Sequence, residues 1–198
     1  MRKIRAWFEV QQLYMPYATV VRDRLAASDS FTDEPELINL FLPSAIRTTV
    51  ACVDSLRRYE FEHREAQAND ALNEIRDRLR LRTHLYKFKD RFIRGQRPNT
   101  RSRSEINRLS QKIDMSAKKY EVAYEALVRL APILDETEWN TYLKPLDRDH
   151  DIRALDEAGY DQSEGKRRLS WIWLAPGVIL DANGEEGDEH VHDGKFRA

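Results

Sequence analysis

The sequence predicts an all-α protein: a small helical bundle with a long antiparallel helical hairpin and a disordered acidic C-terminal tail. Three observations support this prediction. All seven glycines lie at or beyond position 95, so the first 94 residues contain none. The prolines leave two long stretches, residues 44–97 and 99–131, in which nothing forces a helix to break. An apolar heptad stripe runs through the second stretch.

Length and composition indicate one intracellular domain. A chain of 198 residues has room for a single core, which we expect within residues 1–175. The composition, 41% hydrophobic and 34% charged, is typical of a helical protein with a modest core. Cys52 has no second cysteine to pair with, and the mixed charges of the N-terminus do not resemble a secretion signal. No window approaches the roughly 20 apolar residues that cross a bilayer, so we expect a nuclear or cytoplasmic protein without a membrane partner.

A long helix is expected over residues 44–94. From Pro43 to Ile93 the chain is dominated by Ala, Leu, Arg, Glu and Lys, and proline is accepted in the first turn of a helix. About 50 residues would span about 75 Å. The segment "GQRPNT" then places Gly95 just past the last periodic residue and Pro98 three positions later. This pattern ends the helix and predicts a reversal of the chain.

The partner helix of the hairpin is expected over residues 102–131. Ser102 and Glu105 have the spacing of a capping box, and Pro132 marks the expected end. Its stripe, in steps of three and four, is Ile106, Leu109, Ile113, Ser116, Tyr120, Ala123, Leu127 and Leu130. The facing stripe on the long helix is Leu72, Ile75 and Leu79, followed one register over by Leu81, Leu85, Phe88 and Phe92. Two facing stripes predict an antiparallel hairpin over residues 43–131.

Short helices are expected on both sides of the hairpin. In residues 1–42 they would cover the first half of the long helix, and one of them is expected to start at Pro35 in "PELINLFL". In residues 132–175 we expect short helices and loops.

Local signals refine the region after the hairpin. Asp135 with Glu138 repeats the capping-box spacing, and Asp151 is a second candidate cap. The apolar segment "RRLSWIWL" at residues 167–174 fits either a strand or a short helix. Residues 176–198 are polar, acidic and rich in glycine, which is typical of a disordered tail.

Basic residues concentrate around the expected turn. Residues 74–103 hold eleven Lys or Arg and three acids, a balance of +8, whereas residues 133–198 hold eight and sixteen, a balance of −8. Two interpretations stay open: neutralisation of one region by the other, or a basic patch for an anionic partner. The candidate nucleic-acid-binding residues are Arg76, Arg80, Lys87, Lys89, Arg91, Arg94, Arg97, Arg101 and Arg103.

The basic residues have two possible roles. Contacts to DNA phosphates would give binding that falls steeply with salt and carries little sequence information. The alternative is a solvated helix face whose arginine stems shield apolar surface.

No complete catalytic or metal site can be assembled from the sequence. "DRDHD" at residues 147–151 is better explained as a loop rich in helix-capping residues than as a metal site. His190 and His192 are two ligands in a polar tail, which make a weak site. Nucleophile elbows, phosphate loops and paired zinc-cysteine motifs are absent from the sequence. We therefore expect no enzyme activity, no cofactor, no metal and no small-molecule substrate.

One long segment resembles a known family. "REAQANDALNEIRDRLRLRTHLYKFKDRFIRGQRPNTRSRSEINRLSQKID", residues 64–114, is similar to the C-terminal part of the fungal Kyakuja–Dileera–Zisupton (KDZ) transposases. The segments "QLYMP", "LFLPSAI", "AYEALVRLAP" and "RRLSWIW" resemble the same region in the same order. The resemblance covers about residues 5–175.

The resemblance implies a relation to cut-and-paste DNA transposases, whose RNase H-like core holds divalent metals. This chain resembles the helical region downstream of that core, so no catalytic residue is carried over; two-metal chemistry needs rigidly held carboxylates, and the sequence offers no strand series to hold them. The acidic ending and the absence of a cysteine cluster depart from the family. We therefore expect a non-catalytic fragment or remnant of such a transposase, with DNA, a second copy of the chain or another transposase subunit as partner. The alternative is a coiled-coil protein–protein interaction module with no nucleic-acid role.

Overall fold

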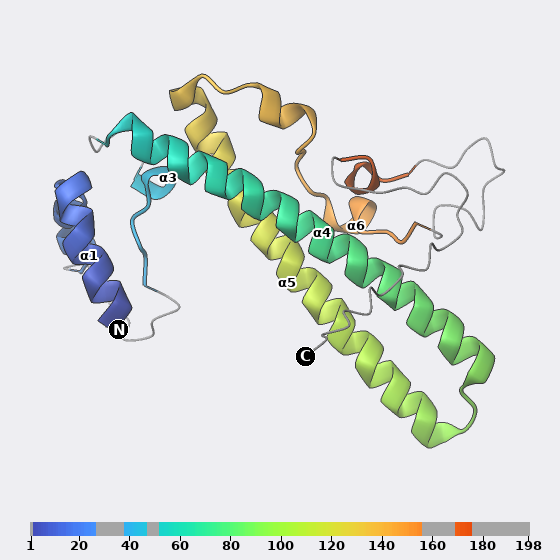
Figure 1. Ribbon diagram of the computed structural model, residues 1–198. Helices are drawn as coiled ribbons and strands as arrows, with labels where there is room; N and C mark the ends of the chain where they lie inside the picture. Colours follow the sequence, from blue (N-terminus) through green and yellow to red (C-terminus); the bar gives the residue numbers. More distant parts are fainter. Residues whose placement is uncertain (1, 27–37, 47–51, 156–168, 176–198) are drawn as a thin grey trace, which may run out of the picture.

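Helices account for all the regular structure that is described. The computed structural model describes residues 2–26, 38–46, 52–155 and 169–175 (Figure 1). Within these residues there is no strand, which confirms the all-α prediction. The elements are α1 (Arg2–Tyr14), α2 (Ala18–Ala26), α3 (Pro43–Ile46), α4 (Asp54–Phe92), α5 (Gln96–Leu134), η3 (Glu138–Thr141), α6 (Arg148–Asp151) and η5 (Trp171–Trp173).

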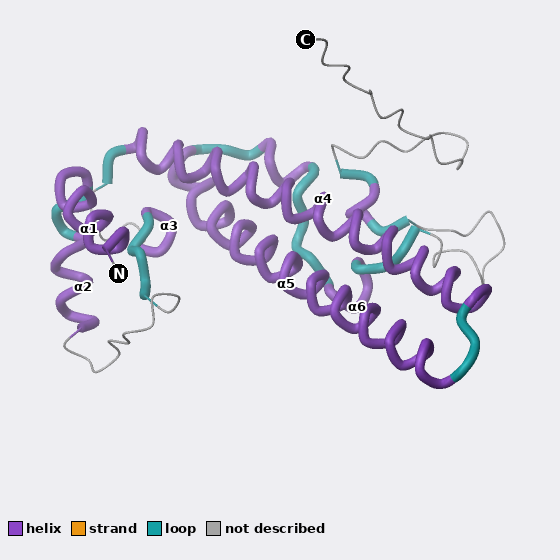
Figure 2. The backbone as a smooth tube through the Cα atoms, turned by 60° about the horizontal axis from the view of Figure 1, so that its bottom comes forward, coloured by secondary structure: helices purple, strands orange, loops and turns teal. Residues whose placement is uncertain are grey.

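Helices α4 and α5 form the predicted antiparallel hairpin (Figures 1 and 2). Each has 39 residues and is therefore about 58 Å long at 1.5 Å per residue. The connection between them contains Gly95, whose φ of +88° lies in a region that other residues enter only with strain. The N-terminal helices lie at the end of the hairpin opposite this connection.

The long helix begins at Asp54, so the prediction that it starts near residue 44 is wrong. Val53 has extended backbone, with φ −66° and ψ 133°, and α3 is a separate single turn. The backbone N–H and the hydroxyl of Ser44 donate to the Glu60 carboxylate at 2.8 and 2.6 Å. The first N–H groups of a helix have no partner inside it, so Glu60 satisfies one of them and holds α3 against α4. A continuous helix would place these two residues four turns apart.

The partner helix is longer than the predicted 102–131 at both ends. It begins at Gln96, because Pro98 falls in the first turn, where its missing N–H costs nothing. Ser102 therefore lies inside the helix rather than at its cap. At the other end the helix passes Pro132 and stops at Leu134, since a proline this close to the C-terminus removes only one donor. Because α5 equals α4 in length, it accompanies more of α4 than the predicted half.

The seam of the hairpin confirms the stripe predicted on α5. Every member of that stripe is buried, and Leu72, Ile75 and Leu79 on α4 are fully buried opposite it. The main core also includes Phe61, Ala68, Ala71, Ala117, Ala131, Trp139, Leu143, Ile172, Trp173 and Ala175.

Beyond Leu79 the predicted stripe on α4 is wrong except at Leu85. Leu81, Phe88 and Phe92 are 50%, 54% and 62% exposed. In α4 and its C-cap, the residues beyond Leu79 that are half-buried are Arg82, Thr83, Leu85, Lys89 and Ile93. A regular α-helix keeps its buried face at 3.6-residue intervals, so α4 continues the register of its first half instead of shifting it.

A second, smaller core joins α1 and α2 to residues 38–46. It consists of Met15, Ala18, Phe41 and Ile46, with Phe8, Val21, Cys52 and Leu56 packed against it. Residues 38–42 are not helical, which makes the predicted helix from Pro35 wrong over its described part. The Leu40 carbonyl accepts hydrogen bonds from the Trp7 indole and the Gln11 amide, both at 3.0 Å. The backbone groups that a helix would pair internally are thus paired with α1.

The segment after the hairpin folds back along it. Asp135 ends α5 with left-handed backbone, φ 56° and ψ 37°, instead of starting a helix. Asp147 caps α6 by accepting from the N–H groups of Asp149 and His150, whereas Asp151, the predicted cap, ends α6. The segment that fitted a strand or a helix forms the 3-10 turn η5. The predicted tail, residues 176–198, lies outside the described residues.

Glu74 links the two long helices. Its carboxylate accepts a hydrogen bond from the Ser116 hydroxyl at 2.7 Å and pairs with Lys119 at 3.0 Å and Arg78 at 2.8 Å. The Ser116 hydrogen bond, followed by that of Lys119, holds the pKa of Glu74 below its usual 4.5. The ionised form is therefore favoured by folding.

We expect the contribution of Glu74 to the free energy of unfolding to be lost in acid. Its contribution is complete above the unfolded pKa near 4.5 and is lost as the pH falls through the lower folded value. Urea unfolding at pH 7 and pH 3 should show that Glu74→Gln is less stable than the wild type by about 0.5–1 kcal/mol at pH 7 and that this difference is smaller at pH 3. Asp70→Asn, at an exposed site on α4, controls for net charge. An unchanged gap between the wild type and Glu74→Gln at the two pH values would contradict this account.

Candidate nucleic-acid interface

The far end of the hairpin is strongly basic. We define the basic tip as residues 87–108, which contain eight Lys or Arg and two acids, a balance of +6. These are the last turns of α4, the connection and the first turns of α5. In both views the basic tip extends beyond the other described helices (Figures 1 and 2). A projecting helical end of this kind offers its charge on several sides at once.

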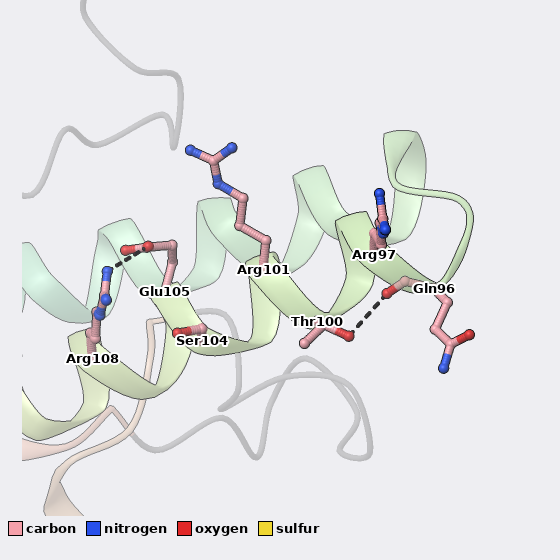
Figure 3. Close-up of a pocket in the computed structure, with 7 residues that line it drawn as sticks. All are labelled: Gln96, Arg97, Thr100, Arg101, Ser104, Glu105 and Arg108. Atoms are coloured by element: carbon pink, nitrogen blue, oxygen red, sulfur yellow. Dashed lines mark hydrogen bonds and ion pairs between the residues drawn. The ribbon is translucent and has the colours of Figure 1, made fainter.

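Two arginines of α5 stand on one open face of the basic tip. Arg97 and Arg101 are four residues apart and point away from the helix (Figure 3). Arg108, seven residues further on, falls on the same face and pairs with Glu105 at 2.8 Å. This face carries a shallow hollow lined by Gln96, Arg97, Thr100, Arg101, Ser104, Glu105 and Arg108. Guanidinium groups with hydroxyl and amide neighbours are the donors that bind phosphate oxygens.

The charges of the basic tip differ from those nearer the core in their pairing. Near the core, most of the long basic side chains on α4 and α5 meet a carboxylate: Arg64 with Glu60, Arg78 and Lys119 with Glu74, Arg129 with Glu125, and Arg148 of α6 with Glu121. Besides Arg94, which is described below, four arginines of the basic tip have no ion pair within the described residues: Arg91, Arg97, Arg101 and Arg103. All four are exposed. Their charge is therefore not cancelled by the described part of the chain.

Two other basic side chains of the tip have structural roles. The Arg94 guanidinium donates to the carbonyls of Asp90 and Ile93 at 2.9 and 3.2 Å. A cation at the last carbonyls of a helix is favourable, so Arg94 caps the end of α4. Lys89 is half-buried along the seam. Lys87, by contrast, is exposed.

Arg76 does not lie on the basic surface where the sequence placed it. Its side chain is 2% exposed, and its guanidinium donates to the Ile172 carbonyl at 2.6 Å and the Ala175 carbonyl at 3.3 Å. Burial, with repulsion from Arg80, lowers the pKa of this guanidinium. The prediction that Arg76 is exposed is wrong because η5 packs on this part of α4. A buried guanidinium cannot reach a phosphate.

Arg80 also lies apart from the basic tip. It pairs with Asp77 at 3.4 Å, and its guanidinium lies 5.5 Å from the centre of the Trp173 ring. Of the candidates predicted from sequence, the structure thus gathers seven at the tip: Lys87, Lys89, Arg91, Arg94, Arg97, Arg101 and Arg103.

The sequence analysis missed an aromatic pair beside these cations. Phe88 and Phe92 were assigned to the seam, but their exposed rings lie side by side with centroids 5.1 Å apart. The heptad register of Leu72, Ile75 and Leu79, extended without a shift, is the signal that would have placed them outside.

Other kinds of site receive no support from the described residues. In the part of the chain that the structure describes, no three His, Cys, Asp or Glu side chains come together as metal ligands would. His150 contacts Asp147 at 2.7 Å as part of the cap of α6. Among the described helices, none combines the length and the apolar composition that a bilayer span requires.

Comparisons of the chain with protein-family models, curated proteins and solved structures give no match.

Proposed function

We propose that this protein contacts the phosphate backbone of DNA through the basic tip of its helical hairpin. The observation that carries the proposal is the set of exposed arginines without ion pairs, Arg91, Arg97, Arg101 and Arg103, on a projecting end of the molecule. Such charges displace counterions from a polyanion, and this displacement is the main source of affinity in sequence-independent binding.

The resemblance to the helical region of KDZ transposases points the same way. The transposases of this family act on DNA, so a backbone-contacting role is consistent with the resemblance. In this proposal the chain is a non-catalytic part of such a system, and its partners are DNA and another transposase subunit.

The alternative function is a coiled-coil interaction module. It would need the heptad stripe of α5 to be available to a second chain. That stripe is buried against α4 of the same chain, from Ile106 to Leu130. The alternative is therefore less well supported than the DNA-contacting role.

A salt titration with a labelled 20-base-pair duplex tests the proposal. By fluorescence anisotropy, we expect the wild-type protein to bind with an affinity that falls steeply as salt rises. The variant Arg91→Glu/Arg97→Glu/Arg101→Glu should bind at least about 100-fold more weakly at low salt, because three phosphate contacts become repulsive.

The matched control changes the same amount of charge on the same hairpin. Lys112→Glu/Lys118→Glu/Arg129→Glu alters three exposed residues of α5 outside the basic tip. At 0.1 M salt this control should keep affinity within about tenfold of the wild type, since screening then limits the reach of exposed charges to about 10 Å. Equal losses in the two variants, or no binding by the folded wild type at low salt, would overturn the proposal.

A further inference from the structure

The basic tip carries an exposed aromatic pair. Phe88 and Phe92 are one helical turn apart on α4, 54% and 62% exposed, with ring centroids 5.1 Å apart and ring planes at 42°. Fully burying a Phe side chain is worth about 1.5–3 kcal/mol, and adjacent exposed apolar side chains mark a candidate contact surface. The buried core of α4 ends at Leu79, so these rings do not support the fold.

Cations surround the aromatic pair. Phe88 and Phe92 line an open hollow together with His84, Lys87, Asp90 and Arg91. The Arg91 guanidinium lies 5.9 Å from the centre of the Phe92 ring. Beyond the connection, five and nine residues after Phe92, Arg97 and Arg101 stand exposed on α5. The surface thus presents flat apolar faces and phosphate-binding groups within the same few turns of helix.

We propose that Phe88 and Phe92 stack on unpaired bases, so that the basic tip binds single-stranded nucleic acid in preference to duplex. This inference rests on the proposed contact between the basic tip and phosphates and adds the form of nucleic acid to it. Every base has a face that stacks on an aromatic ring, whereas the bases of a duplex already stack on each other and are not available. Arginines beside the rings then neutralise the phosphates of the same strand.

Charge argues against a second copy of this chain as the occupant of the aromatic pair. Two such tips facing each other would bring together two surfaces with a balance of +6 each. Like charges juxtaposed across an interface are strongly unfavourable. A nucleic-acid strand has the opposite charge to the basic tip, and its bases can stack on the two rings.

The test compares two labelled strands with equal numbers of phosphates: a twelve-residue oligothymidine and a strand of the same length with abasic sugars. At moderate salt, the wild-type protein should bind oligothymidine at least about fivefold more tightly than the abasic strand, the smallest ratio expected when one base stacks. In Phe88→Leu/Phe92→Leu this ratio should fall to about one while the affinity for the abasic strand stays the same. Tyr86→Leu removes an exposed ring from another face of α4 and should keep the wild-type ratio.

The outcomes separate this inference from the proposed function. Salt-dependent binding with equal affinity for the two strands would overturn the stacking inference and leave the phosphate contact standing. Binding to neither strand nor duplex would overturn both. A wild-type dimer that Phe88→Leu/Phe92→Leu converts to a monomer in analytical ultracentrifugation would show that a second copy covers the rings, and would also overturn the inference.

Discussion

Arg76→Ala is expected to lower the free energy of unfolding by about 2–4 kcal/mol. The substitution removes a guanidinium that donates to the carbonyls of Ile172 and Ala175, and both acceptors lose that donor in the interior. Hydrogen bonds made by a charged group are the stronger kind, and a buried group left without its partner bears the full cost of desolvation. The long stem of Arg76 also fills space between α4 and η5, so its loss leaves a cavity.

Urea unfolding followed by circular dichroism measures this effect. Arg80→Ala is the matched control, because it removes the same side chain one turn away from an exposed position and should cost less than about 1 kcal/mol. Arg76→Lys keeps the charge but cannot reach two carbonyls with a planar fork, and it should fall between the two. If Arg76→Ala is as stable as Arg80→Ala, the packing of η5 on α4 is not what the structure describes.

Arg76 also shows where sequence reasoning reaches its limit. Its spacing from Arg80 puts both residues near the basic stretch of α4, and that local pattern predicts an exposed arginine. Its actual partner, Ile172, is 96 residues away. A local pattern contains no information about a contact of that kind, so a surface residue and a buried one look alike in the sequence.

The hairpin itself was predictable because its signals are local. A heptad stripe, a glycine just past the helix and a stretch without proline are all read within a few turns of chain. The start of α4 was not predictable in this way. It depends on Ser44 and Glu60 meeting across a break, and propensity alone extends the helix through the gap.

The two proline errors have a shared cause. Pro98 and Pro132 were treated as boundaries, yet both lie inside α5, within a turn of its ends. The first turn of a helix does not use its N–H groups, and Pro132, two residues before the end of α5, removes one intrahelical donor without ending the helix at once. A proline in the sequence therefore predicts the boundary of a helix only to within about one turn and does not identify the terminal residue.

The basic tip was partly predictable for the same reason as the hairpin. The positions of Arg97 and Arg101 beside the turn follow from the local charge pattern and the glycine stop. The aromatic pair was not recognised, because Phe88 and Phe92 fit an apolar stripe as well as they fit a surface. Only the register of α4 beyond Leu79, set by its packing against α5, decides between the two.

We expect Trp173 to contribute more than any other side chain of η5 to holding this segment against the hairpin. It is 1% exposed, its indole N–H donates to the Arg153 carbonyl at 3.0 Å, and it lies in the main core. The Arg80 guanidinium covers its ring at 5.5 Å. Since η5 is only one turn long, its position depends on what its side chains bury rather than on its own hydrogen bonds.

Trp173→Ala should therefore lower the free energy of unfolding by about 3–5 kcal/mol, the cost of emptying a large buried site. Circular dichroism is the suitable signal, because the substitution removes a fluorophore. Trp173→Phe keeps most of the buried ring and loses the hydrogen bond to Arg153, so it should cost about 1–2 kcal/mol. Leu174→Ala, at the next residue and 65% exposed, is the control and should change stability by less than about 0.5 kcal/mol. Equal stabilities for Trp173→Ala and Leu174→Ala would mean that η5 does not pack on the hairpin. The buried position of Arg76, which depends on that packing, would then also be wrong.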